Sequence, residues 1–258
     1  MRKNRIKRAL LFCIVINLAG SSFSQKVDSV DSLSHLNGAV TVTNNGISFI
    51  PTFTLCKPAV IFDLSMGKRL SFDPQFRFAL EGKPWSFIFW WRYKLIKTDK
   101  FLFTMGAHPA LAFNTVKIST DGGSKEIIMA QRYLAGELSP NYFLAKNISI
   151  GFYYLYAHCF ETDAPGNTHF LTFNANFSSI NLTKQFFIRF NPQFYYLRID
   201  ENDGFYFSSS LTLARRNFPI SISALINKTI QTSISASKDF VWNASLIYSF
   251  KHNYVKAQ

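Results

Sequence analysis

Five histidines are the first residues to consider for chemistry, and two of them, His35 and His252, lie near the ends of the chain. None of the other three, His108, His158 and His169, is followed two residues later by serine, the pattern sought for a lipid-deacylating enzyme. A catalytic nucleophile also needs an acid or a base close to it. The sequence shows no such pair, and we predict that the protein is not an enzyme.

Metal-ligating residue types cluster around one segment of the chain. They are His158, Cys159, Glu161, Asp163 and His169. Such side chains bind transition metals where they converge, but their spacing matches no zinc pattern. A polar loop explains the same residues, so we expect no metal ion and no cofactor.

The N-terminus has the three-part layout of a secretory signal peptide. Five cations within the first eight residues precede an apolar run at 9–18 and a stretch of small and polar residues that ends at Ser24. The apolar run is about half of the ~20 residues that a membrane-spanning helix needs. We predict that residues 1–24 are a signal peptide and that the mature chain begins at Gln25.

Loss of that peptide removes five cations and lowers the formal net charge from +13 to +8. A basic chain raises the question of nucleic acid, but an exported protein rarely meets any, and we expect no nucleic-acid partner. Two cysteines remain, Cys56 and Cys159. They are too few for a disulfide scaffold, and we expect free thiols.

The composition of the chain indicates an all-β fold. The sequence has 28 Phe, 11 Tyr and 4 Trp, and the mature chain keeps no apolar period of 3.6 residues. Apolar and polar residues alternate instead, most clearly from Phe240 to Phe250. The large rings would overfill a small closed core, whereas they suit a band that faces lipid. A soluble exported barrel that binds a small apolar ligand is the alternative, because alternation does not say which face is outside.

Connections between the predicted strands alternate in character. One set is short and basic, as at 66–68 and 215–217, and the other is mostly longer and acidic or glycine-rich, as at 161–167 and 200–204. Short turns on the periplasmic side and longer loops on the extracellular side are typical of transmembrane β-barrels. The sequence therefore favours a membrane barrel over a soluble one.

We predict a transmembrane antiparallel β-barrel of twelve strands over residues 47–250. Residues 25–46 are expected to be a periplasmic lead-in or plug, within which 38–43 could form a short extra strand, and residues 251–258 a periplasmic tail. The predicted strands are 47–55, 58–65, 69–80, 85–97, 101–119, 125–143, 148–159, 168–180, 185–199, 204–215, 218–230 and 240–250.

The last predicted strand carries Trp242 and Tyr248 and closes on Phe250. It resembles the C-terminal recognition strand of bacterial outer-membrane barrels, although here residues 251–258 follow the aromatic. From about Ser34 to Phe250 the chain resembles outer-membrane barrels of this size that are common in Bacteroidetes. The resemblance implies an outer-membrane location, lipid and the barrel-assembly machinery as partners, and Trp242, Tyr248 and Phe250 as the assembly signal.

Residues that face each other across a hairpin lie on the same barrel face, and this phases the strands. Pairing Leu80 with Trp85 puts Asp73 opposite Arg92, so that polar side chains meet inside the lumen. The hairpin across 181–184 gives the same result. The lumen-facing candidates are Asp73, Arg77, Arg92, Lys94, Tyr153, Asn174, Asn176, Arg189, Asn191, Gln193 and Tyr195.

The strand predicted at 125–143 cannot be phased in this way. Arg132 and Glu137 fall on opposite faces of an unbroken strand. We therefore expect a bulge between them, since an extra residue would bring both onto one face.

A barrel of twelve strands lies between the eight that side chains fill and the sixteen that leave an aqueous channel. One hypothesis is a narrow pore for small solutes or anions, because rings of arginine select anions. Another is a largely plugged structural barrel, in which pairs such as Asp73 and Arg92 satisfy buried charges. A third is an outer-membrane enzyme that acts on lipid or peptide at the outer rim.

The first test concerns export. Protein isolated from outer membranes should give the mass of a chain that begins at Gln25, because the signal peptide is removed during secretion. Detection of an intact 1–24 segment by mass spectrometry, or recovery of the protein in a soluble fraction, would contradict this prediction.

Overall fold

The computed structural model describes residues 33–120, 123–162, 164–235 and 237–255. Residues 34–258 form one compact unit, to which the barrel belongs. The predicted signal peptide lies outside the described residues. Within the described ranges, no helix is long and apolar enough to cross a membrane.

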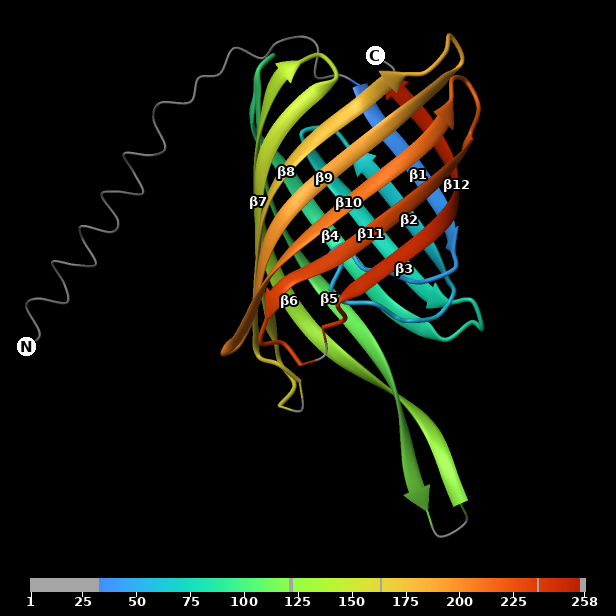
Figure 1. Cartoon of the computed structure of the whole chain (residues 1–258), viewed down its shortest axis with the longest axis vertical. Helices are drawn as coiled ribbons and strands as arrows, with labels where there is room; N and C mark the ends of the chain where they lie inside the picture. Colours follow the sequence, from blue (N-terminus) through green and yellow to red (C-terminus); the bar gives the residue numbers. More distant parts are fainter. Residues whose placement is uncertain (1–32, 121–122, 163, 236, 256–258) are drawn as a thin grey trace, which may run out of the picture. The chain divides into compact units, whose positions relative to one another are not determined.

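Twelve strands form a closed antiparallel barrel in the described part of the chain (Figure 1). Each strand pairs with the next along the chain, and β12 pairs with β1 to close the sheet. The prediction of an all-β barrel of twelve antiparallel strands is thus confirmed. The strands are β1 (Leu33–Thr43), β2 (Ala59–Gly67), β3 (Leu70–Ala79), β4 (Pro84–Lys97), β5 (Phe101–Thr120), β6 (Gly123–Ala145), β7 (Ile148–Cys159), β8 (Asn167–Asn181), β9 (Phe186–Ile199), β10 (Asn202–Arg215), β11 (Ile220–Thr232) and β12 (Phe240–Val255).

The two ends of the barrel differ in their connections. The turn end, where β1 begins and β12 ends, carries short turns at 68–69, 98–100, 146–147, 182–185 and 216–219. The opposite end, named here the loop end, carries the connections at 44–58, 80–83, 160–166, 200–201 and 233–239. There the β5–β6 hairpin extends well beyond the barrel wall (Figure 1).

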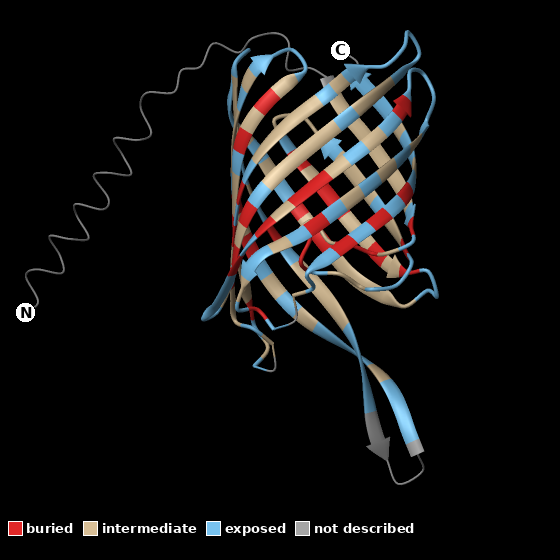
Figure 2. Cartoon of the chain, viewed as in Figure 1, coloured by how far each residue is buried: buried red, intermediate tan, exposed pale blue. Residues whose placement is uncertain are grey.

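Side chains alternate between an apolar outer face and a buried inner face. On β6, Leu134 and Leu138 point outward and are 52% and 43% exposed, whereas Ala135 and Glu137 point inward and are buried. Less exposed and more exposed positions also alternate along parts of several other strands in Figure 2. So large an exposed apolar surface is not tolerated in water, but a lipid-facing band requires it. The fold is therefore that of a transmembrane β-barrel.

The first strand is not where the sequence predicted it. We expected a strand at 47–55 and a lead-in at 25–46, but β1 occupies Leu33–Thr43. Residues 47–55 lie in the β1–β2 connection, where Ile47 and Thr54 form an isolated bridge. The count of twelve holds because one predicted strand is lost and another is gained.

The two hairpin registers predicted from sequence are each displaced by two residues. Asp73 pairs with Trp90 instead of Arg92, and Asn174 pairs with Gln193. Each pairing contains a bulge close to its turn, and turn geometry sets register. Outside the bulges, a shift of two leaves the side chains on their predicted faces, so only the cross-strand partners change there.

The bulge predicted between Arg132 and Glu137 is absent, because β5 and β6 pair without any register shift. The two side chains do point to opposite faces. Arg132 lies outside, where its side chain is 69% exposed and bonds Glu161, and Glu137 lies inside with its side chain 1% exposed. An arginine on the outer face is accommodated here because it sits at the loop end, next to a partner in the β7–β8 loop.

Phe250 does not end the last strand, since β12 continues to Val255. Its ring instead fills a notch on the outer face of β1. A Cβ atom added to Gly38 would lie 2.4 Å from Phe250 Cζ and 3.0 Å from Leu64 Cδ2. The absence of a side chain at Gly38 thus lets the ring cover the β12–β1 seam that closes the barrel.

The seam contact can be tested with two outward-facing glycines. Gly38→Val should lower the free energy of unfolding by about 1–3 kcal/mol, because the new side chain overlaps the Phe250 ring. Gly136→Val is the matched control, since a Cβ there meets only a carbonyl oxygen at 3.9 Å. Thermal unfolding in detergent measures both variants.

The coupling between the two seam residues separates this effect from a general glycine effect. Adding Phe250→Ala to Gly38→Val should cost little more than Phe250→Ala alone, because the overlap is then gone. A loss in the double variant equal to the sum of the losses in the two single variants would mean that Phe250 does not pack on Gly38.

Candidate functional site: the plugged lumen

Residues 44–58, between β1 and β2, form a hairpin of their own, named here the plug hairpin. Its backbone bonds include Gly46 N to Lys57 O and Leu55 N to Gly46 O, both 2.8 Å. Its tip is a turn in which Phe53 N donates to Ile50 O at 2.9 Å. Pro51 follows Ile50 at the turn position that the fixed φ of proline favours. A proline also explains why this apolar segment is not a barrel strand.

The tip of the plug hairpin is buried inside the barrel. Ile50 is 3% exposed and Thr52 8% exposed, and Pro51 is among the fully buried residues. Ile50 belongs to an apolar cluster that also contains wall residues of β4, β6, β7, β8, β9 and β10: Ile88, Trp90, Ala135, Leu155, Phe170, Tyr195, Leu197 and Tyr206. The tip of the plug hairpin thus packs against the part of the wall that runs from β4 to β10.

Directed contacts hold the plug hairpin in place. Tyr195 donates its hydroxyl proton to Asn227 Oδ1 at 2.8 Å, so the 2.8 Å contact between Thr52 and Tyr195 has Thr52 as donor. On the opposite wall Arg77 donates to Ser48 Oγ at 2.9 Å. These bonds pair polar groups that would otherwise be buried without partners.

Rings add a second layer of contact between the plug hairpin and the wall. The Phe49 ring lies edge-on to Trp90 and Phe170, with centroids 5.7 and 6.3 Å apart. The Arg77 guanidinium carbon lies 5.9 Å from the Phe49 ring centre and 5.6 Å from that of Trp85. Edge-to-face rings and an arginine over a ring are favourable geometries.

A polar network runs along the inner wall beside the plug hairpin. Arg92 on β4 donates from Nε to Glu137 at 2.6 Å and from Nη1 to Asp73 at 3.1 Å. Tyr153 on β7 donates to the other oxygen of Glu137 at 2.6 Å. One cation thus holds two carboxylates from strands on either side of it. This network is a structural ion cluster, with every buried charge in contact with an opposite one.

Gly106 on β5 makes room for that ion cluster. A Cβ atom at this position would lie 2.7 Å from Glu137 Oε1 and 3.1 Å from Arg92 Cγ. Because β5 stands between β4 and β6, any side chain there would push the arginine and the glutamate apart. Gly106 is visible in the sequence, but its role can be inferred only when Arg92 and Glu137 are known to lie on the two neighbouring strands.

His35, Ser65 and Asp73 are also in contact, and they test the hypothesis of an enzyme. Ser65 donates to Asp73 Oδ1 at 2.6 Å, and His35 Nε2 lies 2.9 Å from Ser65 Oγ. In a catalytic triad the acid orients the histidine, which then takes the proton of the serine. Here the acid binds the serine itself, so His35 acts as a donor and the serine is not activated.

The remaining predicted residues line other parts of the inner wall. Lys94 donates to Lys68 O at 3.0 Å, and the guanidinium of Arg189 lies 5.4 Å from the Phe187 ring centre near the turn end. Asn176 pairs in register with Ser149. Of the predicted assembly signal, Trp242 and Tyr248 lie exposed on the outer face of β12.

The predictions missed Glu137, His35, Ser65 and the plug hairpin. The inward direction of Glu137 could have been predicted, because the apolar Leu134 and Leu138 mark the even-numbered residues of β6 as lipid-facing. His35 was dismissed because it precedes the first predicted strand. Local sequence cannot show that a segment folds back into its own barrel, because the burying walls come from distant strands.

A cavity of about 210 Å³ lies beside the tip of the plug hairpin, toward the turn end. Phe49 of the plug hairpin and Phe170 form its apolar part, and Tyr153 connects it to the ion cluster. The predicted residues Asn174, Asn191 and Gln193 contribute amides, and Ser139 and Thr172 contribute hydroxyls. Asn174 donates to Thr172 Oγ1 at 3.3 Å.

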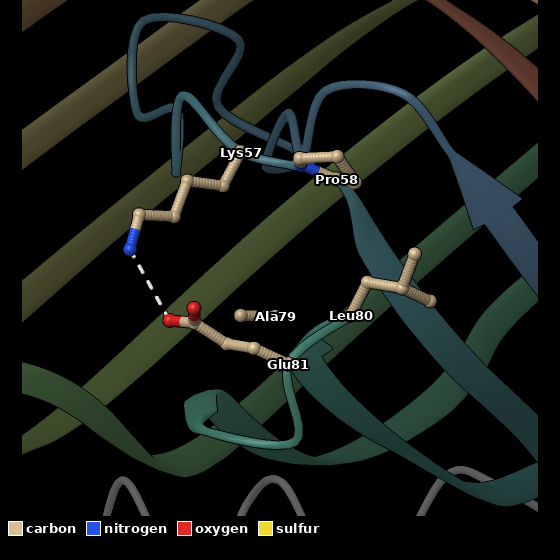
Figure 3. Close-up of a pocket in the computed structure, with 5 residues that line it drawn as sticks. All are labelled: Lys57, Pro58, Ala79, Leu80 and Glu81. Atoms are coloured by element: carbon tan, nitrogen blue, oxygen red, sulfur yellow. Dashed lines mark hydrogen bonds and ion pairs between the residues drawn. The ribbon is translucent and has the colours of Figure 1, made fainter.

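A second pocket, of about 350 Å³, lies at the base of the plug hairpin and is shown in Figure 3. Lys57 and Glu81 reach toward each other across it, with 3.2 Å between Nζ and Oε1 (Figure 3). Both side chains are largely exposed, and exposed pairs contribute little to stability. This rim pocket is open to solvent and carries no cluster of reactive groups.

The candidate metal-ligating residues that the structure describes do not form one group, although Cys159 Sγ lies 3.6 Å from Glu161 Oε2. His158 Nδ1 contacts Asn167 at 3.2 Å and His169 Nδ1 contacts Tyr154 at 2.9 Å, both on the outer face. Cys159 points inward, and Asp163 lies outside the described residues. Among the described residues, no group of three or more metal-ligating side chains occurs. Cys56 and Cys159 are both free thiols.

Arg132 and Glu161 form an ion pair at the loop end. Arg132 donates from its side chain and its backbone N to Glu161, at 2.6 and 2.7 Å. These bonds lower the pKa of Glu161 below its ordinary value. The pair joins β6 to the β7–β8 loop in an ionised form and offers no acid for catalysis at neutral pH.

The closed barrel, its apolar outer face and its filled lumen define an outer-membrane-type β-barrel. No family model matches the chain, and no curated protein matches it. Nothing in the comparisons points to the Bacteroidetes barrels that the sequence resembles.

Solved structures of bacterial outer-membrane barrels match most of the chain. The KdgM porin in complex with disordered oligogalacturonate is 8% identical over 84% of this chain and 99% of its own, with a TM-score of 0.46. The NanC porin is 12% identical over 85% and 100%, with a TM-score of 0.45. LpxR from Salmonella typhimurium is 10% identical over 83% and 99%, with a TM-score of 0.44. At such identities and TM-scores, these likenesses carry no argument about what this chain does.

The ion cluster predicts an order of effects among three substitutions. Arg92→Gln should be the most damaging, at about 3–5 kcal/mol, because it leaves two buried carboxylates without a cation. Glu137→Gln and Asp73→Asn should each cost less, since the other acid still balances Arg92. Thermal or urea unfolding of the refolded barrel measures all three.

The double variant Arg92→Gln with Glu137→Gln provides the internal control. It should recover part of the Arg92→Gln loss, because the more buried carboxylate is then neutral. Equal losses in the three single variants, with no recovery in the double, would show that the ion cluster does not form.

Proposed function

We propose that the protein is an integral outer-membrane barrel whose lumen is closed by its own plug hairpin, and that it acts as a barrier and not as an open pore or an enzyme. The short turns and the turn end face the periplasm, and the plug hairpin enters from the extracellular side. Export uses the signal peptide at 1–24. Lipid surrounds the wall, and the barrel-assembly machinery reads Trp242, Tyr248 and Phe250.

The burial of Ile50 carries this proposal, in a hairpin that is bonded to β9 through Thr52 and to β3 through Ser48. An open channel would need water where Ile50 contacts wall residues of several strands. The anion-pore hypothesis is weaker, because Arg92 is engaged by two carboxylates and Arg77 by Ser48 and Gln75. Arginines held in this way are fixed against the wall and do not form a free ring.

Planar-bilayer conductance tests the barrier. The wild-type barrel should show at most rare, brief openings, because the plug hairpin blocks the ion path. Replacement of residues 47–54 by a glycine-serine linker of equal length should raise the open-channel conductance by about tenfold or more, since a twelve-stranded wall without its filling leaves space inside.

A matched control replaces Ser124 and Lys125 with glycines. These exposed residues lie at the same end of the barrel, in the β5–β6 hairpin that extends beyond the wall, so conductance should not change. Steady ion-selective conductance of the wild-type protein would overturn the barrier and favour the anion pore. No change on removal of the plug hairpin would mean that other groups close the lumen.

A further inference from the structure

We propose that the cavity beside the tip of the plug hairpin is a binding site for a small, neutral, hydroxyl-rich solute of the size of one sugar ring. The site is lined by three amide side chains, three hydroxyl side chains and two phenyl rings, as described above, and by no charged side chain. It goes beyond the barrier function and does not depend on it.

The amides supply the hydrogen-bonding capacity of the site. The side chains of Asn191 and Gln193 face the cavity and form no hydrogen bond with any described residue, which leaves donors and acceptors available on both. Thr172 Oγ1 accepts from Asn174 and keeps its own proton available. Groups that both donate and accept match a ligand hydroxyl, which also does both. A carboxylate or an ammonium group would use only half of this capacity.

Phe49 and Phe170 determine the shape of the ligand. Their rings lie edge to face, 6.3 Å apart, and give the cavity an apolar part beside the amides. A pyranose ring has C–H groups on its faces and hydroxyls around its edge, so it can contact the rings and the amides together. Binding sites typically combine apolar walls with a few placed polar groups.

The size of the cavity suits a ligand of one ring. Its volume of about 210 Å³ is below the ~300–1,000 Å³ typical of sites for drug-sized ligands. Asn191 and Asn174 lie nearer the turn end than the plug contact, so we expect a solute to enter from the turn end. Phe49 comes from the plug hairpin, and the ligand would therefore rest against the plug.

The positive charge of Arg189 near the cavity makes an acidic sugar the alternative ligand. Arg189 precedes Asn191 by two residues on the same face of β9, and its side chain stacks on Phe187. It does not line the cavity, but it would attract an acidic sugar. A neutral ligand and an acidic one are therefore compared in the same experiment.

Isothermal titration calorimetry of the refolded full-length mature barrel tests the site, in an amine-oxide detergent that has no sugar headgroup. The ligands are the neutral hexoses glucose, galactose and mannose, then glucuronate, and cyclohexanol as a ring with one hydroxyl. We expect saturable one-to-one binding of at least one neutral hexose, weaker binding of glucuronate, and none of cyclohexanol. No saturable binding of any hexose, or a preference for glucuronate or cyclohexanol, overturns the proposal without need of a variant.

The double variant Asn191→Leu with Gln193→Met removes both amides and keeps their bulk. It should weaken hexose binding by about tenfold or more, because two net hydrogen bonds are lost. Asn114→Leu is the control, since that exposed amide lies on β5 away from the cavity, and its affinity should equal that of the wild type. Unchanged affinity in a folded double variant would overturn the proposal, whatever the conductance of the barrel.

Discussion

Backbone pairing across the β12–β1 seam is the constraint on which the rest of the structure depends. A sheet edge left open in lipid exposes N–H and C=O groups that no water can satisfy, at several kcal/mol for each group. The chain meets this constraint by bringing its first and last strands together. Gly38 and Phe250 meet on the outer face at that seam, so a single missing side chain lets an aromatic ring cover the junction. Closure also fixes the number of strands and with it the width of the lumen.

That width explains why the lumen has two kinds of filling. Side chains fill an eight-stranded barrel, but twelve strands leave space that they do not reach across. Near the loop end the plug hairpin supplies the missing volume with Phe49, Ile50 and Pro51. Along the wall beside it, charged side chains face charged side chains, and Arg92 contacts Glu137 and Asp73. Buried charges rarely increase stability over an apolar core, so their main effect here is to fix the relative positions of β3, β4 and β6.

The sequence was sufficient for the fold class and the face of most side chains, because alternation with a period of two is a local property. The number of strands was correct only because the misassigned strand at 47–55 was offset by β1 at Leu33–Thr43. Register was not predictable to better than two residues, because bulges near the turns leave no clear local signal. The segment at 47–55 was misassigned for a physical reason: residues buried in a lumen and residues exposed to lipid are equally apolar. Pro51 was the available evidence against a strand. The predicted contact between Asp73 and Arg92 is present although the predicted register was wrong. A long arginine side chain reaches diagonal neighbours on the same face.

The energy needed to withdraw the plug hairpin bears on whether the barrel could open without a trigger. Exposing Phe49 and Ile50 costs about 1.5–3 kcal/mol for each side chain, and each net hydrogen bond lost at Thr52 and Ser48 costs about 1 kcal/mol. The sum is roughly 5–8 kcal/mol, which corresponds to an open fraction of about one in 10⁴ or less. Spontaneous opening is therefore rare but measurable in a single-channel record. A ligand that rests against Phe49 would change that fraction only if it binds the open and closed forms with different affinity.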